Sequence, residues 1–243
     1  MKETELKYLN DPEEVTGQAK LLAVQETEDG RIAIILDSTL FYPQGGGQPS
    51  DRGTISSSDG KFEVMDTRFK DGIVLHYGEF IQGTIELESN VQLSVNEERR
   101  MINNRNHTAG HLIDVAMYNC DFRFLPAKGY HFPDSPYVEY VGTIDAEERP
   151  EAIKLLNAEL GRLILENTKV NWEIVESKED LKETCKFIPD YLPEGKPIRV
   201  VTVSDIGCPC GGTHVKQLKD LGGVLVHKIK AKSGNTRISY RLT

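Results

Sequence analysis

The sequence predicts an α+β protein in which a small antiparallel β-barrel is followed by a mixed domain. Three Asp-Gly pairs separate short runs of β-branched and aliphatic residues in the N-terminal part of the chain. Asp-Gly between apolar runs is a strong hairpin signal, because both residues tolerate positive φ. Further along, two segments repeat apolar residues at helical spacing. We therefore expect a barrel domain over residues 1–95 and an α+β domain over residues 96–243.

The strands predicted for the barrel are short and regularly spaced. They cover residues 18–25, 31–37, 62–66, 73–77, 83–87 and 91–95. The hairpin signals are Asp29-Gly30, Asp59-Gly60 and Asp71-Gly72. Many short antiparallel strands joined by regular turns are typical of a small barrel.

One glycine-rich stretch interrupts this pattern. Residues 41–53 read FYPQGGGQPSDRG, and the consecutive residues Gly45, Gly46 and Gly47 leave the backbone without Cβ atoms. A ligand can lie close against such a backbone, although the same glycines can simply make a loop mobile. The stretch is not a P-loop, because no Gly-Lys-Ser/Thr follows at the required spacing.

The second domain is expected to begin with a helix. Asn96 is its predicted N-cap, with Glu97 and Glu98 in the first turn, where the helix dipole favours anions. The helix runs to about residue 118. Asp145 is the predicted N-cap of a second helix. The elements expected after the first helix are strands at 128–132 and 137–144, a helix at 146–167, a short helix after Ser177, and strands near 199–203 and 224–241.

The charge balance argues against a general nucleic-acid binder. The 243 residues carry a formal net charge of −9, whereas phosphate contacts require Lys and Arg. The C-terminal residues 221–243 are an exception, because they contain no Asp or Glu but several basic residues. Lys228, Lys230 and Lys232 alternate, so they share one face of a strand. This strip is either a solvated edge strand protected by lysines or a phosphate-facing surface.

Nothing in the sequence predicts a membrane protein or a secreted one. No apolar run approaches the roughly 20 residues that a membrane helix requires. The N-terminus has no apolar region typical of a secretory signal, so we expect a cytoplasmic protein. In such a chain the four cysteines more often serve as metal ligands, reactive thiols or small core residues than as disulfides. These cysteines are Cys120, Cys185, Cys208 and Cys210.

Two short motifs carry the candidate chemistry. His107 and His111 are four residues apart in the predicted helix, so both imidazoles lie on one face and can reach one ion. Cys210 and His214 have the same spacing in a glycine-rich segment that can wrap closely around an ion. Three imidazoles and one thiolate suit Zn²⁺. Thr108 stands where a zinc protease of the HExxH type carries its glutamate, so a protease of this type is not expected, whereas a purely structural zinc is the main alternative.

These motifs resemble those of a known family. HTAGH, followed after a long interval by GCPCGGTHV, is similar to the editing domain shared by alanyl-tRNA synthetases and free-standing alanyl-tRNA editing proteins. Upstream, FYPQGGGQPSDRG resembles the glycine-rich motif that precedes this domain in both. The three motifs occur in the family's order and span nearly the whole chain.

The resemblance implies an architecture and an activity. The architecture is a barrel like those of translation factors, followed by an α+β editing domain with zinc held by His107, His111, Cys210 and His214. The activity is that of a zinc-dependent aminoacyl-tRNA deacylase, which hydrolyses the ester of tRNA(Ala) mischarged with serine and also with glycine. The chain has no room for an ATP-dependent aminoacylation domain, so we expect ATP-independent action in trans.

The resemblance also suggests further site residues, and the sequence departs from the family near some of them. The substrate-binding candidates are Gly45, Gly46, Gly47, Gln48 and Lys128. Relatives often carry Gln where this chain has Ala127, and often Glu where it has Gln44. His131 can take a polar role nearby, although core or surface use is the simpler interpretation.

The general base is not identified by the sequence. Thr108 and Cys208 are weak candidates for a catalytic role, and Cys208 is also an alternative ligand to Cys210. Two other functions stay open: a non-catalytic tRNA-binding module with a structural zinc, and an editing hydrolase for another mischarged tRNA, such as that of the threonyl system.

Overall fold

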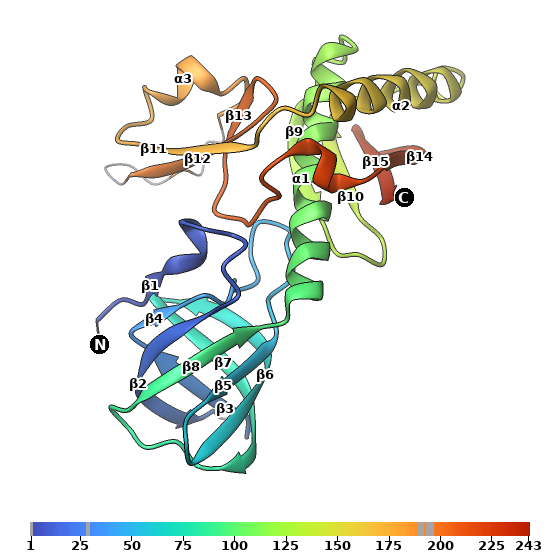
Figure 1. Cartoon of the computed structure of the whole chain (residues 1–243). Helices are drawn as coiled ribbons and strands as arrows, with labels where there is room; N and C mark the ends of the chain where they lie inside the picture. Colours follow the sequence, from blue (N-terminus) through green and yellow to red (C-terminus); the bar gives the residue numbers. More distant parts are fainter. Residues whose placement is uncertain (1, 28–29, 189–191, 193–196) are drawn as a thin grey trace. The chain divides into compact units, whose positions relative to one another are not determined.

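The computed structural model describes residues 2–27, 30–188, 192 and 197–243 (Figure 1). It is mostly β with a few helices, which is compatible with the predicted α+β class. The chain divides into two compact units, Met1–Ile102 and Asn103–Thr243. The predicted functional boundary at residue 95 stays a prediction.

The first unit contains a closed antiparallel barrel with the strand order β2-β3-β7-β6-β5-β8. A short parallel pair, β1 (Glu5–Leu6) with β4 (Ser38–Thr39), and a 3-10 helix, η1 (Lys7–Leu9), accompany it. The barrel strands are β2 (Thr16–Glu26), β3 (Ile32–Leu36), β5 (Gly53–Ser56), β6 (Gly60–Lys70), β7 (Ile73–Gly83) and β8 (Asn90–Val95).

The hairpin signals explain much of this barrel. Asp71 and Gly72 adopt φ of 49° and 81°, and the flanking Lys70 and Ile73 pair in register, as Asp-Gly predicts. Asp59-Gly60 lies in the β5–β6 connection. At the third signal Gly30 has φ of 77°, whereas Asp29 lies outside the described residues.

The barrel also corrects two predictions about strand extent. The strand predicted at 83–87 is wrong, because β7 ends at Gly83, whose φ of 50° turns the chain out of the sheet. β6 is longer than the predicted 62–66, because its pairing with β7 continues through two register shifts. Inside the barrel, buried side chains such as Phe62, Val64 and Leu93 form the core.

The second unit combines helices with two antiparallel sheets. The four-stranded sheet has the order β14-β15-β10-β9, and the three-stranded sheet has the order β11-β12-β13. Its helices are α1 (Glu97–Asn119), whose first turns belong to the first unit, α2 (Arg149–Glu166), α3 (Leu181–Thr184) and the 3-10 helix η2 (Leu218–Leu221). Its strands are β9 (Leu125–Tyr130), β10 (Tyr137–Val141), β11 (Asn171–Val175), β12 (Ile198–Val203), β13 (Ile206–Pro209), β14 (Val224–Lys232) and β15 (Asn235–Leu242).

The predicted start of α1 is confirmed. The Oδ1 atom of Asn96 accepts a 2.9 Å hydrogen bond from the backbone N–H of Arg99, as an N-cap does. The predicted start of α2 is wrong, because the helix begins at Arg149 and not after Asp145. Pro150 explains the difference, because proline has no backbone N–H and is favoured in the first helical turn, where N–H groups have no intrahelical acceptor.

The strands of this unit differ from the predicted ones in their bounds and in their number. β9 ends at Tyr130, before the predicted residue 132, and β10 ends at Val141, where Gly142 has φ of 130°. The segment 224–241 forms a hairpin whose turn residues, Ser233 and Gly234, adopt φ of 52° and 83°. β11 and β13 were not predicted.

One hydrophobic core joins α1, α2 and strands of both sheets. Leu112, Leu156, Val138 and Ile238 are among its buried members. Asn157 fixes α2 to β14, because its side chain donates to the carbonyl of Val226 at 2.9 Å and accepts from its N–H at 2.8 Å. None of the helices in the described ranges combines the length and apolar character required to cross a membrane.

Candidate metal centre

His107 and His111 come from α1 and lie one turn apart on the same face of the helix. Their ring centroids are 5.1 Å apart. His107 is buried and His111 is half-buried. The helix therefore supplies two adjacent imidazoles, as the spacing predicts.

Cys210 and His214 come from the loop that follows β13. Cys210 is fixed by its own backbone, because its N–H donates to the carbonyl of Arg199 at 3.0 Å. The N–H of Gly212 donates to the Cys210 sulfur at 3.3 Å, so the loop folds back over the sulfur atom. Glycines in this segment allow such a tight path.

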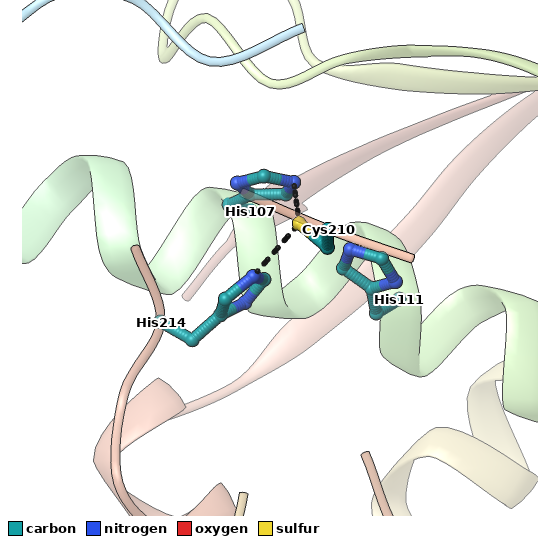
Figure 2. A group of neighbouring side chains, drawn as sticks. All are labelled: His107, His111, Cys210 and His214. Carbon is teal, nitrogen blue, oxygen red and sulfur yellow. Dashed lines mark hydrogen bonds between the residues drawn. The ribbon is translucent and has the colours of Figure 1, made fainter. Parts of the chain in front are cut away.

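The two pairs meet in one cluster (Figure 2). The ligand atoms of His107, His111, Cys210 and His214 all lie within 4.8 Å of one another. The Sγ atom of Cys210 is 3.5 Å from Nε2 of His107 and 3.3 Å from Nε2 of His214. Zn–N and Zn–S bonds of a tetrahedral site place ligand atoms about 3.3–3.6 Å apart, and the two distances from the Cys210 sulfur lie in this range. The group could therefore hold a metal ion.

Thr108 orients one of these ligands. Its hydroxyl donates to the carbonyl of Asn104 at 2.8 Å, so it can only accept from Nδ1 of His214, 3.2 Å away, and from the N–H of Val215. The proton of His214 therefore resides on Nδ1, which leaves Nε2 as the lone pair that faces Cys210. Fixing a tautomer in this way is how outer hydrogen bonds prepare a metal ligand.

Burial keeps the three imidazoles neutral. It lowers the pKa of His111 to about 4, with Arg199 adding to the effect. Burial likewise lowers the pKa of His107 and His214 well below the usual value, and the neighbouring imidazoles add to it. Neutral imidazole is the form that binds a metal ion.

The thiol of Cys210 is protonated without a metal ion. Burial raises its pKa, although the N–H of Gly212 and the charge of Arg199 act in the opposite direction. Binding a cation would therefore release a proton from this residue.

Arg199 supports the ligand loop and was not predicted. From β12 its guanidinium donates to the carbonyls of Cys210 and Gly212 at 2.9 and 3.0 Å. Its side chain also lies over the ring of Trp172. The guanidinium of Arg199 therefore fixes the backbone at Cys210 and two residues after it.

Asp114 is a second residue that the sequence analysis missed. One carboxylate oxygen lies 3.9 Å from Nδ1 of His111, and the other accepts a 2.5 Å hydrogen bond from Tyr140. Burial raises the pKa of Asp114 to about 7, against the effect of this hydrogen bond. The spacing of His111 and Asp114, three residues apart in a predicted helix, was an available signal.

His131 packs behind the cluster. Its ring stacks on that of His107 at 4.6 Å, and its Nδ1 lies 2.8 Å from the hydroxyl of Tyr240. That hydroxyl donates to the carbonyl of Asn106, so it accepts the proton of His131 Nδ1. His131 is therefore a buried polar residue beside a ligand, which combines the two interpretations left open by the sequence.

The remaining predicted residues lie outside the cluster. Lys128 is exposed on β9. Cys208 lies on β13, and burial raises the pKa of its thiol well above the usual value, so it is a neutral thiol at neutral pH. The roles predicted for both residues stay predictions.

The glycine-rich stretch belongs to the first unit. Gly45 and Gln48 exchange two backbone hydrogen bonds of 3.2 and 2.8 Å, and the hydroxyl of Tyr42 donates to the carbonyl of Gly45. Gly46 and Gly47, between them, have φ of 52° and 79°. The stretch is thus a defined tight turn with exposed backbone at its tip, where Gly45 and Gly46 are exposed and Gln48 is buried.

Comparisons with known proteins identify similar sequences. Residues 3–99 match the family model of class II tRNA synthetases (A). The chain is 31% identical over 233 residues to the alanyl-tRNA editing protein AlaX-L of Pyrococcus horikoshii, an alignment that covers 94% of this chain and 55% of that protein. It is 29% identical over 252 residues to the alanine–tRNA ligase of Halobacterium salinarum, which covers 98% of this chain and 26% of the ligase.

A bacterial ligase aligns in the same way. The alanine–tRNA ligase of Wigglesworthia glossinidia brevipalpis is 30% identical over 232 residues, covering 89% of this chain and 26% of the ligase. The chain thus spans about half the length of the editing protein and about a quarter of each ligase. Over nearly its whole length, the chain is similar in sequence to an alanyl-tRNA editing protein and to part of each alanine–tRNA ligase.

Proposed function

We propose that this protein is a zinc-dependent deacylase that hydrolyses the ester of tRNA(Ala) mischarged with serine, and also with glycine. Residues 96–243 form the editing domain in this proposal, and residues 1–95 form the accessory barrel. One observation carries it: four ligand atoms from two distant motifs converge within 4.8 Å in a chain related to alanyl-tRNA editing proteins.

Zinc is the ion that the donor set favours. Three neutral imidazoles and one thiol that can ionise are the ligands that Zn²⁺ prefers. His107, His111, Cys210 and His214 would hold it, and zinc in such a site can polarise a carbonyl or activate water. Around it, Thr108 fixes the tautomer of His214 and Arg199 holds the loop that carries Cys210.

The specificity follows from the chemistry of the competing amino acids. A synthetase pocket discriminates poorly between side chains that differ by one small group, with about 1–3 kcal/mol for a methylene. Serine is larger than alanine and glycine is smaller, so a size sieve fails for one of them. A pocket that hydrogen-bonds the serine hydroxyl favours serine over alanine, because alanine would leave buried polar groups unpaired. Glycine also lacks the hydroxyl, so its release depends on its smaller size and not on this hydrogen bond.

The experiment is deacylation of seryl-, glycyl- and alanyl-tRNA(Ala) by the purified protein, with zinc quantified in the same preparation. We expect release of serine and glycine, sparing of alanine, and about one zinc per chain. His111→Ala should abolish release while the circular dichroism spectrum is kept. The matched control His227→Ala, an exposed histidine on β14, should leave release unchanged.

Two results would contradict the proposal. Zinc bound at full occupancy with no release from any of the three substrates would favour a binding module with a structural zinc. Release of alanine at the same rate as serine would show that the site does not edit.

A further inference from the structure

The outer face of the β14-β15-β10-β9 sheet carries a continuous row of charged side chains. Lys230 pairs in register with Arg237, Arg237 with Glu139, and Glu139 with Lys128. Residues paired in register share one face of a sheet, so these four side chains lie in line across all four strands. The opposite face carries Ile229, Ile238 and Val138, which are buried in the core.

This face is strongly basic in an acidic protein. The four strands together hold one acid, Glu139, and it is already engaged by Arg237 at 2.7 Å. The basic residues of the four strands are all exposed: Lys128, Lys228, Lys230, Lys232, Arg237 and Arg241. The chain as a whole has a net charge of −9, so this face is where polyanions are attracted rather than repelled.

A column of stacked aromatic rings stands on the same face. Phe132 stacks on Tyr130 at 4.5 Å, and Tyr130 stacks on Tyr137 at 5.2 Å, with interplanar angles of 14° and 16°. The guanidinium of Arg237 lies 3.9 Å from the centre of the Tyr137 ring and ends the column. All three rings are half-buried. A nucleobase placed beside Phe132 would continue the stack.

One segment of chain, residues 130–132, connects the column to the candidate metal centre. Tyr130 and Phe132 contribute their rings to the outer column, whereas His131 between them turns inward and stacks on His107 at 4.6 Å. Phe132 therefore follows directly in sequence the side chain that contacts the candidate ligand His107.

Edge protection does not explain this face. β14 is an edge strand, and its lysines do discourage pairing with another chain. However, Arg237 lies on an interior strand, where it protects no edge, and an aromatic column contributes nothing to edge protection.

We propose that this face binds the unpaired 3′-terminal nucleotides of aminoacyl-tRNA, with phosphates on the basic row and bases continuing the aromatic column. The proposal rests on the function proposed above for the choice of tRNA, while the face itself fits single-stranded nucleic acid by charge and by stacking.

The test uses fluorescence anisotropy of the full-length protein with a short, labelled single-stranded RNA that ends in CCA. Lys228→Gln/Lys230→Gln/Lys232→Gln should weaken binding at low salt by at least about tenfold and reduce the salt slope by about 2, which is about 0.7 for each lost phosphate contact. The matched control Lys61→Gln/Lys70→Gln/Lys182→Gln changes three exposed lysines elsewhere and should bind like the unaltered protein.

The aromatic part is tested separately. Phe132→Leu should weaken binding by about tenfold, whereas Phe132→Tyr, which keeps the ring, should not. Binding of the single-stranded RNA by the triple-lysine variant or by Phe132→Leu that equals binding by the unaltered protein would overturn the inference. Equal binding of a blunt RNA duplex by the unaltered protein would also overturn it, because paired bases cannot join the column. Hydrolysis of a seryl ester of adenosine, measured in parallel, tests the reaction without the strand. Deacylation of seryl-tRNA(Ala) by the unaltered protein separates the two proposals: no release while the RNA still binds would refute the proposed reaction and leave the binding face standing.

Discussion

Replacing Asp51 by Asn should destabilise the first unit by about 3 kcal/mol, because the change leaves Arg100 charged and buried without its counterion. The two side chains are 0% and 2% exposed. One oxygen of Asp51 accepts from two nitrogens of Arg100, at 2.9 and 2.5 Å, and from the N–H of Tyr42 at 2.7 Å. This oxygen therefore joins α1 to the glycine-rich stretch.

The magnitude follows from how Arg100 is held. Its other contacts, to the carbonyls of Pro12 and Leu40, fix the guanidinium inside the unit, so it cannot turn out to water. Removing one partner of such a pair costs about 3–5 kcal/mol. Asparagine keeps the shape and one acceptor oxygen, which places the expected loss at the lower end of that range.

Amide hydrogen exchange is the appropriate assay, because it reports on the barrel separately from the second unit. Slowly exchanging amides of β3 should lose about 3 kcal/mol of protection in Asp51→Asn. The double variant Asp51→Asn/Arg100→Met should lose less stability than the sum of the losses in the two single variants, by at least about 1 kcal/mol. Glu88→Gln, in an exposed pair with Lys20, should cost about 1 kcal/mol or less. A loss in Asp51→Asn no larger than this control would refute the reasoning.

Three further predictions concern protonation and metal binding. Burial lowers the pKa of His76 to about 4, so the barrel should lose about 3 kcal/mol as pH falls from 6.5 to 4; hydrogen exchange should show a shallower loss in His76→Gln, and equal slopes would contradict this. Thr108→Val should weaken zinc binding by about 10- to 100-fold in a chelator competition, with Thr108→Ser close to the unaltered protein, because only the hydroxyl accepts from His214. At pH values below the pKa of Cys210, zinc affinity should rise about tenfold for each unit by which pH increases, because binding releases the proton of this thiol. A Cys210→Ala variant that keeps this slope would refute the assignment of Cys210 as a ligand.

Local signals predicted the turns of the barrel better than its strands. Asp71-Gly72 specifies a tight turn through two residues alone, because both tolerate the left-handed conformation. The length of β6 depends on β7, whose pairing with it shifts between Val64 and Asp66. A bulge of this kind reflects the partner strand, so a sequence read segment by segment does not reveal it.

The start of α2 shows two local rules in competition. Asp145 satisfies the N-cap preference, but Pro150 satisfies the preference for proline in the first turn. The structure follows the proline, with a preceding turn in which the N–H of Glu148 donates to the carbonyl of Asp145. Both signals are present in the sequence, but the sequence does not show which of the two decides where the helix begins.

In the candidate site, too, the features that depend on local sequence were predicted and those that depend on long-range contacts were not. The spacing within each motif predicted that His107 and His111, and then Cys210 and His214, would face common points. Arg199 reaches the ligand loop from another strand, 11 residues from Cys210 in sequence. Such a contact depends on strand register, which is why spacing did not predict it.

Gly110 shows how much of the site one short motif specifies. A Cβ atom at this position would lie 2.3 Å from Cε1 of His131, and one at Gly129 would lie 2.4 Å from its Nε2. Glycine inside a helix costs about 1 kcal/mol relative to alanine, so its presence in α1 calls for a physical reason. That reason is the ring of His131, which occupies the space and stacks on His107. HTAGH therefore encodes both the spacing of the two ligands and the space for the imidazole of His131 behind them. The need for this space is apparent only from the structure, because His131 follows β9, which is distant from HTAGH in sequence.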